Sequence, residues 1–108
     1  MINIEKTFQE NNIKFVKTYD DVAKTCYNIL GYHLDTTIEF RKMPDVDVKL
    51  KIKLPKTNLT IYSSDWVRLT YWETTFEQIL PDFISTLETY CLAMKNYVES
   101  QLDKHIRN

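Results

Sequence analysis

Apolar and charged side chains alternate without interruption between residues 46 and 54. The charged positions are Asp47, Lys49, Lys51 and Lys53, and each is followed by valine, leucine or isoleucine. Because successive side chains of a strand point to opposite faces, the apolar residues reach a core only if the three lysines point away from it. The pattern therefore predicts a half-buried β-strand over residues 45–54 with an exposed lysine face.

Three further segments carry strand signals, over residues 36–42, 59–62 and 66–72. They are rich in β-branched and aromatic residues, and short runs with proline, asparagine, aspartate or serine separate the strands from one another. Consecutive strands joined by short turns pair antiparallel with each other. We therefore expect a four-stranded antiparallel meander.

A short helix is predicted over residues 4–10, ahead of the sheet. Asn3 is placed to cap its first turn, and Ile4 and Phe8 lie one turn apart on the same face. The pair Asn11–Asn12 is expected to end the helix.

A second helix is predicted over residues 20–30. Val22 and Cys26 recur at helical spacing, and Gly31 stands where a left-handed helix cap requires a residue without Cβ. The preceding residues 13–18 have two interpretations, as a short strand or as the start of this helical stripe.

The chain is predicted to re-enter helix near Thr75, and a long stretch of helical spacing follows over residues 82–106. Thr75 and Gln78 fit a capping box ahead of it, and Pro81 is expected to kink or restart the helix. At 1.5 Å per residue the helix is about 37 Å long, whereas the central strand spans about 30 Å. We therefore expect the helix to overhang the sheet.

The apolar stripe of this helix has two interpretations. Tyr90, Met94 and Tyr97 share one face, which is typical of core packing. The alternative is the seam of a homodimer. Leu102 and Ile106 favour it, because they lie beyond the reach of the sheet and would expose apolar area unless another element covered them.

Length and composition indicate a single α+β domain over residues 1–108, with N-terminal helix or helices, the four-stranded meander and one long C-terminal helix. Hydrophobic residues make up 44% and charged residues 27% of the chain, which is typical of a globular protein. The single glycine excludes a glycine-rich phosphate-binding loop. Low glycine with frequent asparagine, lysine, isoleucine and tyrosine is a composition that suggests an accessory protein of a phage or mobile element.

No segment has the pattern of a signal peptide or a membrane span, so we expect a cytoplasmic protein without membrane contact. The two cysteines, Cys26 and Cys91, are too few for a disulfide framework, and both are interpreted as buried thiols on predicted helices. Neither His33 nor His105 has a further metal ligand at suitable spacing. No metal or other cofactor is expected.

Charge is unevenly distributed along the chain. Basic residues outnumber acidic ones over residues 41–71, and the reverse holds elsewhere, although the total is only −1. In the 66–72 strand, alternation brings Trp66, Arg68 and Trp72 to the face opposite the aliphatic residues. The predicted binding surface combines these with the lysines and a tyrosine: Lys49, Lys51, Lys53, Tyr62, Trp66, Arg68 and Trp72.

A tryptophan and arginine cluster on a basic surface is typical of a protein-binding hot spot. Our leading hypothesis is a small non-enzymatic binding protein, an adaptor or inhibitor of a macromolecular partner, with protein favoured over nucleic acid. The alternative is a single-stranded nucleic-acid-binding protein, since lysines contact phosphates and flat rings stack on bases. In a third interpretation, the N-terminal helix covers the tryptophans and the lysines only solvate the strand.

A metal-dependent nuclease is a further alternative, which rests on three residues. Asp35 followed by Asp47 and Lys49 is similar to the PD-(D/E)xK nuclease signature, in which two acids bind Mg²⁺ and the lysine supports the attacking water. Asp45 lies too close to Asp47 to serve as the first acid. Surface acids in turns are the simpler interpretation, and no catalytic residue is assigned.

Overall fold

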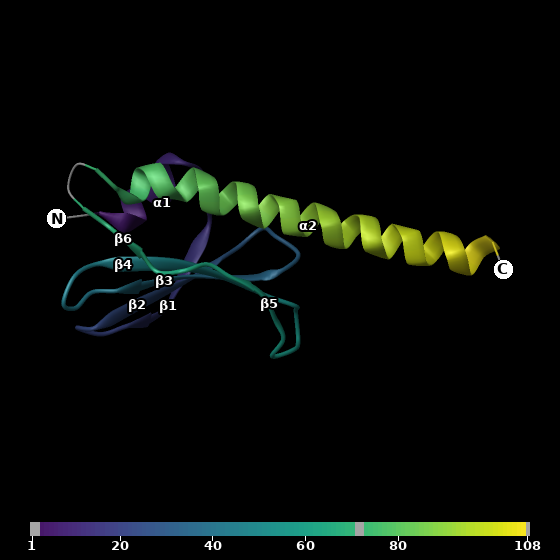
Figure 1. The fold of residues 1–108 in the computed structure, drawn as a ribbon, viewed down its shortest axis with the longest axis horizontal. Coiled ribbons are helices and arrows are strands. Elements are labelled where there is room, and N and C mark those ends of the chain that lie inside the picture. The colour runs from purple at the N-terminus through teal and green to yellow at the C-terminus, as the bar shows by residue number, and fades with distance from the viewer. Residues whose placement is uncertain (1–2, 71–72, 108) are drawn as a thin grey trace.

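The computed structural model describes residues 3–70 and 73–107, with side chains described up to residue 104. The elements are α1 (Ile4–Glu10), β1 (Phe15–Asp20), β2 (Lys24–Ile29), β3 (Asp35–Arg41), β4 (Asp47–Lys53), β5 (Thr60–Ser63), β6 (Val67–Arg68) and α2 (Phe76–Arg107). The strands form one antiparallel sheet, and both helices lie on the same side of it (Figure 1). The predicted α+β class is confirmed.

The N-terminal helix forms as predicted. The Asn3 side chain accepts a hydrogen bond from the Lys6 backbone N–H at 3.0 Å, which satisfies one of the free donors of the first turn. Asn11 ends the helix, and Asn12 follows in a left-handed conformation with φ of 57°. Phe8 is fully buried and fastens α1 to the core.

The predicted helix over residues 20–30 is wrong. This segment forms the turn and second strand of the β1–β2 hairpin, in which Thr25, Tyr27 and Ile29 alternate toward the core. Asp21 fixes the turn, because its Oδ1 accepts hydrogen bonds from the N–H groups of Ala23 and Lys24, both at 2.8 Å. The segment predicted over residues 13–18 as either strand or helix forms strand from Phe15 onward.

The strand predicted over residues 45–54 is the central strand β4 (Asp47–Lys53). Val48, Leu50 and Ile52 are at most 1% exposed, whereas the lysines between them are half-buried on the other face. In the register with β3, Val48 lies opposite Phe40 and Leu50 opposite Ile38. These cross-strand pairs form the middle of the core.

The strand count and edge arrangement differ from the prediction. The sheet has six strands rather than four, because the β1–β2 hairpin joins it. β5 and β6 both pair with β4, one at each end of it. Together they therefore occupy one position at the edge of the sheet, and β6 does not pair with β5. Between β5 and β6, Ser64 keeps the chain attached to β4. Its N–H donates to the Leu50 carbonyl and its Oγ accepts from the Leu50 N–H, both at 2.9 Å.

The long helix α2 begins at Phe76, as the capping box predicts, and runs through Pro81 without restarting. The Gln78 side chain accepts a hydrogen bond from the Thr75 backbone N–H at 3.2 Å, as in the predicted capping box. Pro81 lies on the exposed side in the second turn, where its missing N–H removes one backbone hydrogen bond and the helix continues.

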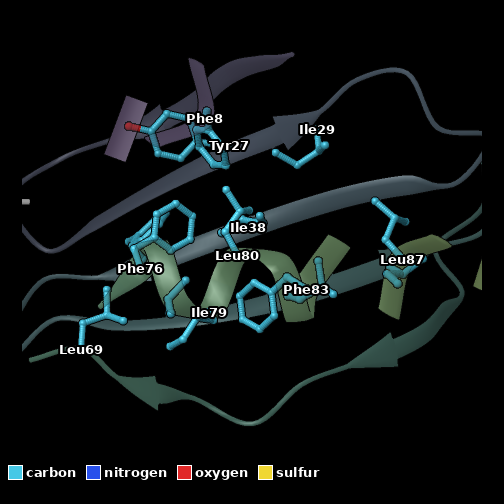
Figure 2. Packing of buried hydrophobic residues seen from close by; sticks show 14 of the residues in the cluster. Phe8, Tyr27, Ile29, Ile38, Leu69, Phe76, Ile79, Leu80, Phe83 and Leu87 are labelled. Atoms are coloured by element: carbon cyan, nitrogen blue, oxygen red, sulfur yellow. The ribbon is translucent and has the colours of Figure 1, made fainter. Parts of the chain in front are cut away.

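An aromatic cluster joins both helices to the sheet. The Phe76 ring of α2 lies 5.4 Å from that of Phe8 and 5.0 Å from that of Phe40, in edge-to-face geometry. Tyr27 completes the cluster, with its ring 5.3 Å from Phe8. Figure 2 shows the buried α2 side chains from Phe76 to Leu87 directed onto the face of the sheet that the helices cover.

Beyond Met94 the helix leaves the sheet, as the length comparison predicted, since Tyr90 and Met94 still pack against the core. The molecule measures 58 × 24 × 22 Å, and the long dimension follows α2, which projects past the sheet (Figure 1). Met94 is half-buried, whereas Tyr97 and Leu102 are 61% and 55% exposed. The core interpretation therefore holds for the start of the stripe and fails for Tyr97. The Ile106 side chain lies outside the described part.

Candidate functional site

The side of the sheet opposite the helices forms an open face. In the described part of the chain, no helix covers it (Figure 1). Its side chains follow from the strand registers, which align Lys24 with Arg41 and Asp47, and Cys26 with Glu39 and Lys49. The open face comprises Val16, Tyr19, Lys24, Cys26, Asn28, Asp35, Thr37, Glu39, Arg41, Asp47, Lys49, Lys51, Lys53, Thr60, Ser63, Trp66 and Arg68.

Asp47 organises the middle of the open face. Its Oδ2 accepts from Arg41 Nη2 at 2.7 Å and Nε at 3.1 Å, and its Oδ1 accepts from Arg68 Nε at 3.1 Å. Only 3% of Asp47 is exposed because the two arginines cover it. The hydrogen bond from Arg41, followed by that from Arg68, holds the pKa of Asp47 below its ordinary value. Arg68 also pairs with Asp45 at 3.1 Å.

Trp66 lies on the same cluster. Its ring centroid is 4.5 Å from the Arg41 guanidinium carbon and 4.7 Å from Lys49 Nζ, both within cation–π range. The indole is half-buried, so part of it faces solvent. The hypothesis that the N-terminal helix covers this tryptophan is wrong, because α1 packs through Phe8 onto the opposite face.

The three lysines predicted for the binding surface lie along the open face. Lys49, Lys51 and Lys53 are half-buried, which is typical of stems lying along a sheet with the ammonium group in water. They stand opposite Glu39, Thr37 and Asp35 in the register with β3. Among the described side chains, no acid forms an ion pair with them.

Two of the seven predicted surface residues do not join this group. Tyr62 lies opposite Ile52 in the β4–β5 register and therefore points to the helix side, where its ring is 5.2 Å from Tyr90 of α2. The placement of Tyr62 beside the lysines was wrong. Trp72 lies outside the described residues.

The structure separates the acids of the nuclease hypothesis. Asp35 pairs with Lys53 at one end of the β3–β4 hairpin, and Asp47 pairs with Arg41 at the other. Six residues of strand separate these rows, about 20 Å. Within the described residues, no group of three histidine, cysteine or acidic side chains could hold a metal ion. His33 is exposed, and the His105 side chain is outside the described part.

Cys26 is buried, as predicted, but it lies on strand β2 rather than on a helix. Its Sγ is 3.6 Å from Glu39 Oε1, and burial raises the pKa of this thiol. Cys91 is only half-buried on α2.

The sequence analysis did not predict the clamp formed by Arg41, Asp47 and Arg68, although alternation in the 36–42 strand places Arg41 on the polar face. Its partner could be identified only from the β3–β4 register.

A cleft of about 860 Å³ lies on the helix side, between α1, the first two strands and the loop before β4. Four of its charged groups pair with one another: Lys17 bridges Glu5 at 2.9 Å, and Asp20 accepts from Lys42 at 2.9 Å. Burial raises the pKa of Tyr27, whose hydroxyl donates to Glu5. Because these groups satisfy each other, we assign the cleft a role in fastening α1 to the sheet.

The depressed pKa of Asp47 predicts acid-sensitive stability. A group with a lowered folded pKa stabilises the protein above its unfolded pKa, about 3.9, and loses that contribution as pH falls through the folded value. Asp47→Asn should therefore lower the urea midpoint at pH 7, and the difference from wild type should shrink progressively below about pH 4. The exposed Asp65→Asn is the matched control and should track wild type. A difference that is unchanged from pH 7 to pH 2 would contradict the role of the Asp47 charge.

Comparison of the chain with known protein families, with curated protein sequences and with solved structures finds no match. Among the described residues, no helix is long and apolar enough to cross a membrane. The residues of the open face are therefore the basis for any functional assignment.

Proposed function

We propose that the chain is a non-enzymatic binding module, an adaptor or inhibitor, whose open face docks on an acidic protein surface. The observation that carries this proposal is Trp66 lying against Arg41 and Lys49 on an uncovered sheet. Tryptophan and arginine are the residues most enriched in binding hot spots. The clamp around Asp47 supports the proposal further, because side chains held in place lose little conformational entropy on binding.

The charge of the open face supports an acidic partner. Basic side chains outnumber acidic ones there, and Lys49, Lys51 and Lys53 form no ion pair with an acid among the described side chains. A complementary acidic surface would supply those partners and would accelerate association through long-range attraction. The same charges would repel basic surfaces, which adds selectivity.

A protein partner is favoured over single-stranded nucleic acid by the arrangement of rings and acids. Nucleic-acid grooves combine a continuous positive track with several stacking rings. Among the described residues, a single ring, that of Trp66, contacts a lysine of β4, whereas the Tyr62 ring packs against α2. Glu39 and Asp47 interrupt the basic track.

A matched pair of triple variants tests the role of the open face. In the first, Lys49, Lys51 and Lys53 are changed to glutamate. In the control, the exposed Lys14, Lys56 and Lys104 are changed to glutamate, so that net charge falls equally. A Trp72→Phe background makes fluorescence report Trp66 alone. We expect poly-L-glutamate to bind with Trp66 quenching that weakens with salt, and we expect the open-face triple to bind about tenfold or more weakly than the control.

Other outcomes of that titration would overturn the assignment. Tighter binding of an oligo-dT strand than of poly-L-glutamate would favour the nucleic-acid alternative. Equal binding by the two triple variants would show that net charge, rather than the open face, governs the interaction. Circular dichroism of each variant confirms that the fold is retained.

We also propose that the chain associates with a second copy of itself through the projecting half of α2. The supporting observation is the exposure of Leu92, Tyr97, Val98 and Leu102 on this segment, each at 47% or more. Exposed apolar residues gathered on one element typically mark an interaction site. Light scattering should then give twice the mass of one chain.

A further inference from the structure

The apolar stripe of α2 continues past the end of the sheet without a change in spacing. Phe83 and Leu87 pack on the sheet, and Cys91, Met94, Val98 and Leu102 follow on the same face at intervals of three or four residues. Val98 and Leu102 are 47% and 55% exposed. Figure 1 shows this half of α2 standing clear of every other described element.

We propose that a second copy of the chain covers this stripe, with the two projecting helices antiparallel and related by a two-fold axis beside Tyr97. This arrangement rests on the self-association proposed above and specifies its geometry. The element that covers the stripe is the projecting half of α2 from the second copy, because it carries an identical uncovered stripe of matching length. A two-fold interface of this kind uses one surface patch twice.

Steric exclusion determines the orientation. The stripe faces the side on which this chain's own sheet already packs against Phe76 to Leu87. A parallel, in-register partner would bring its own residues 76–87 into the space of that sheet. With a two-fold axis at residue 97, residues 91–103 of the two helices lie opposite each other, beyond the Tyr90 that Tyr62 of β5 contacts. The shared length of 13 residues corresponds to about 20 Å.

Charge complementarity supports the same axis. Lys95 and Glu99 are one helical turn apart beside the stripe, and the described structure gives neither an ion pair. Both lie two residues from Tyr97, so the two-fold axis brings Lys95 of each copy opposite Glu99 of the other. Two reciprocal pairs form at the edge of the apolar seam, as in antiparallel helix pairs whose flanking charges set orientation.

Charge exchange tests this register. Lys95→Glu carries two acids beside the stripe and Glu99→Lys carries two bases, so each variant alone should repel its own copy. We expect each to dimerise about tenfold more weakly than wild type in sedimentation equilibrium. An equimolar mixture should recover the dimer as a heterodimer. Val98→Asp, which changes a half-exposed residue, should leave the circular dichroism unchanged and abolish the dimer.

The native Cys91 reports the orientation independently. Cys91 is six residues from the axis, so the two thiols of an antiparallel pair would stand about 18 Å apart along the helices. In a parallel pair they would be separated only by the distance between helix axes, about 8–10 Å. A short bismaleimide should therefore fail to join two wild-type chains and should join chains of a Tyr97→Cys, Cys91→Ser variant.

The outcomes separate this inference from the proposed self-association. A wild-type chain that stays monomeric at millimolar concentration would overturn both. A dimer that Val98→Asp abolishes, but that tolerates both charge variants and crosslinks through Cys91, would leave self-association standing and overturn the antiparallel register. Recovery of the dimer in the mixture, without Cys91 crosslinking, supports it.

Discussion

Replacing Phe8 with alanine should lower the free energy of unfolding by about 3–5 kcal/mol, a large share of the stability of a domain this size. Phe8 is fully buried, and its ring contacts Phe15 of β1, Tyr27 of β2 and Phe76 of α2 at centroid distances of 5.0, 5.3 and 5.4 Å. Truncation removes these contacts and leaves a cavity between three elements. The seven-residue α1 is too short to be stable without this packing.

Urea denaturation followed by circular dichroism measures the effect of Phe8→Ala. Val22→Ala is the control, because Val22 is 82% exposed in the β1–β2 turn and its truncation should change the free energy of unfolding by about 0.5 kcal/mol or less. A loss below about 1 kcal/mol for Phe8→Ala would contradict the packing of α1 onto the sheet.

Where one local signal dominated, the sequence predicted the structure well. The alternation from Val46 to Leu54 fits only a strand with one buried face, and β4 has the predicted orientation. The caps at Asn3 and Thr75 are local hydrogen-bonding motifs that work whatever the surrounding fold is. The position of the lysine row on the open face followed directly from the same alternation.

Residues 20–30 could not be assigned from local pattern because they satisfy two periods at once. Val22 and Cys26 fit helical spacing, while Thr25, Tyr27 and Ile29 fit alternation. Pairing of Tyr27 with Ile38 across β2 and β3 decides in favour of the strand. Such contacts between distant segments are absent from any local window.

The candidate site was predictable in its composition and less so in its geometry. Trp66 and Arg68 share the lysine face because alternation in a strand requires it. Tyr62 was misplaced because β5 is only four residues long and its pairing with β4 contains a register shift between Ile52 and Lys53. A shift of one residue reverses the face of a side chain.

Leu87→Ala should lower the free energy of unfolding far more than Leu102→Ala, although both residues lie on the same stripe of α2. Leu87 is fully buried against the sheet, and its truncation should cost about 2–5 kcal/mol in free energy of unfolding. Leu102 is 55% exposed beyond the sheet, so its truncation should change the stability of the single chain by about 0.5 kcal/mol or less. Both are measured by urea denaturation in the Val98→Asp background, which keeps the chain monomeric.

The same two substitutions distinguish the two functions of the stripe when Val98 is intact. Leu102→Ala should then weaken the dimer in sedimentation equilibrium, because in the dimer its side chain packs against the partner helix rather than against the sheet. Equal destabilisation by both substitutions in the monomeric background would mean that the projecting half is already covered within one chain. In that case no second copy would be required to cover the apolar stripe. If instead Leu87→Ala strongly lowers the free energy of unfolding and Leu102→Ala weakens only the dimer, the core ends between these two residues.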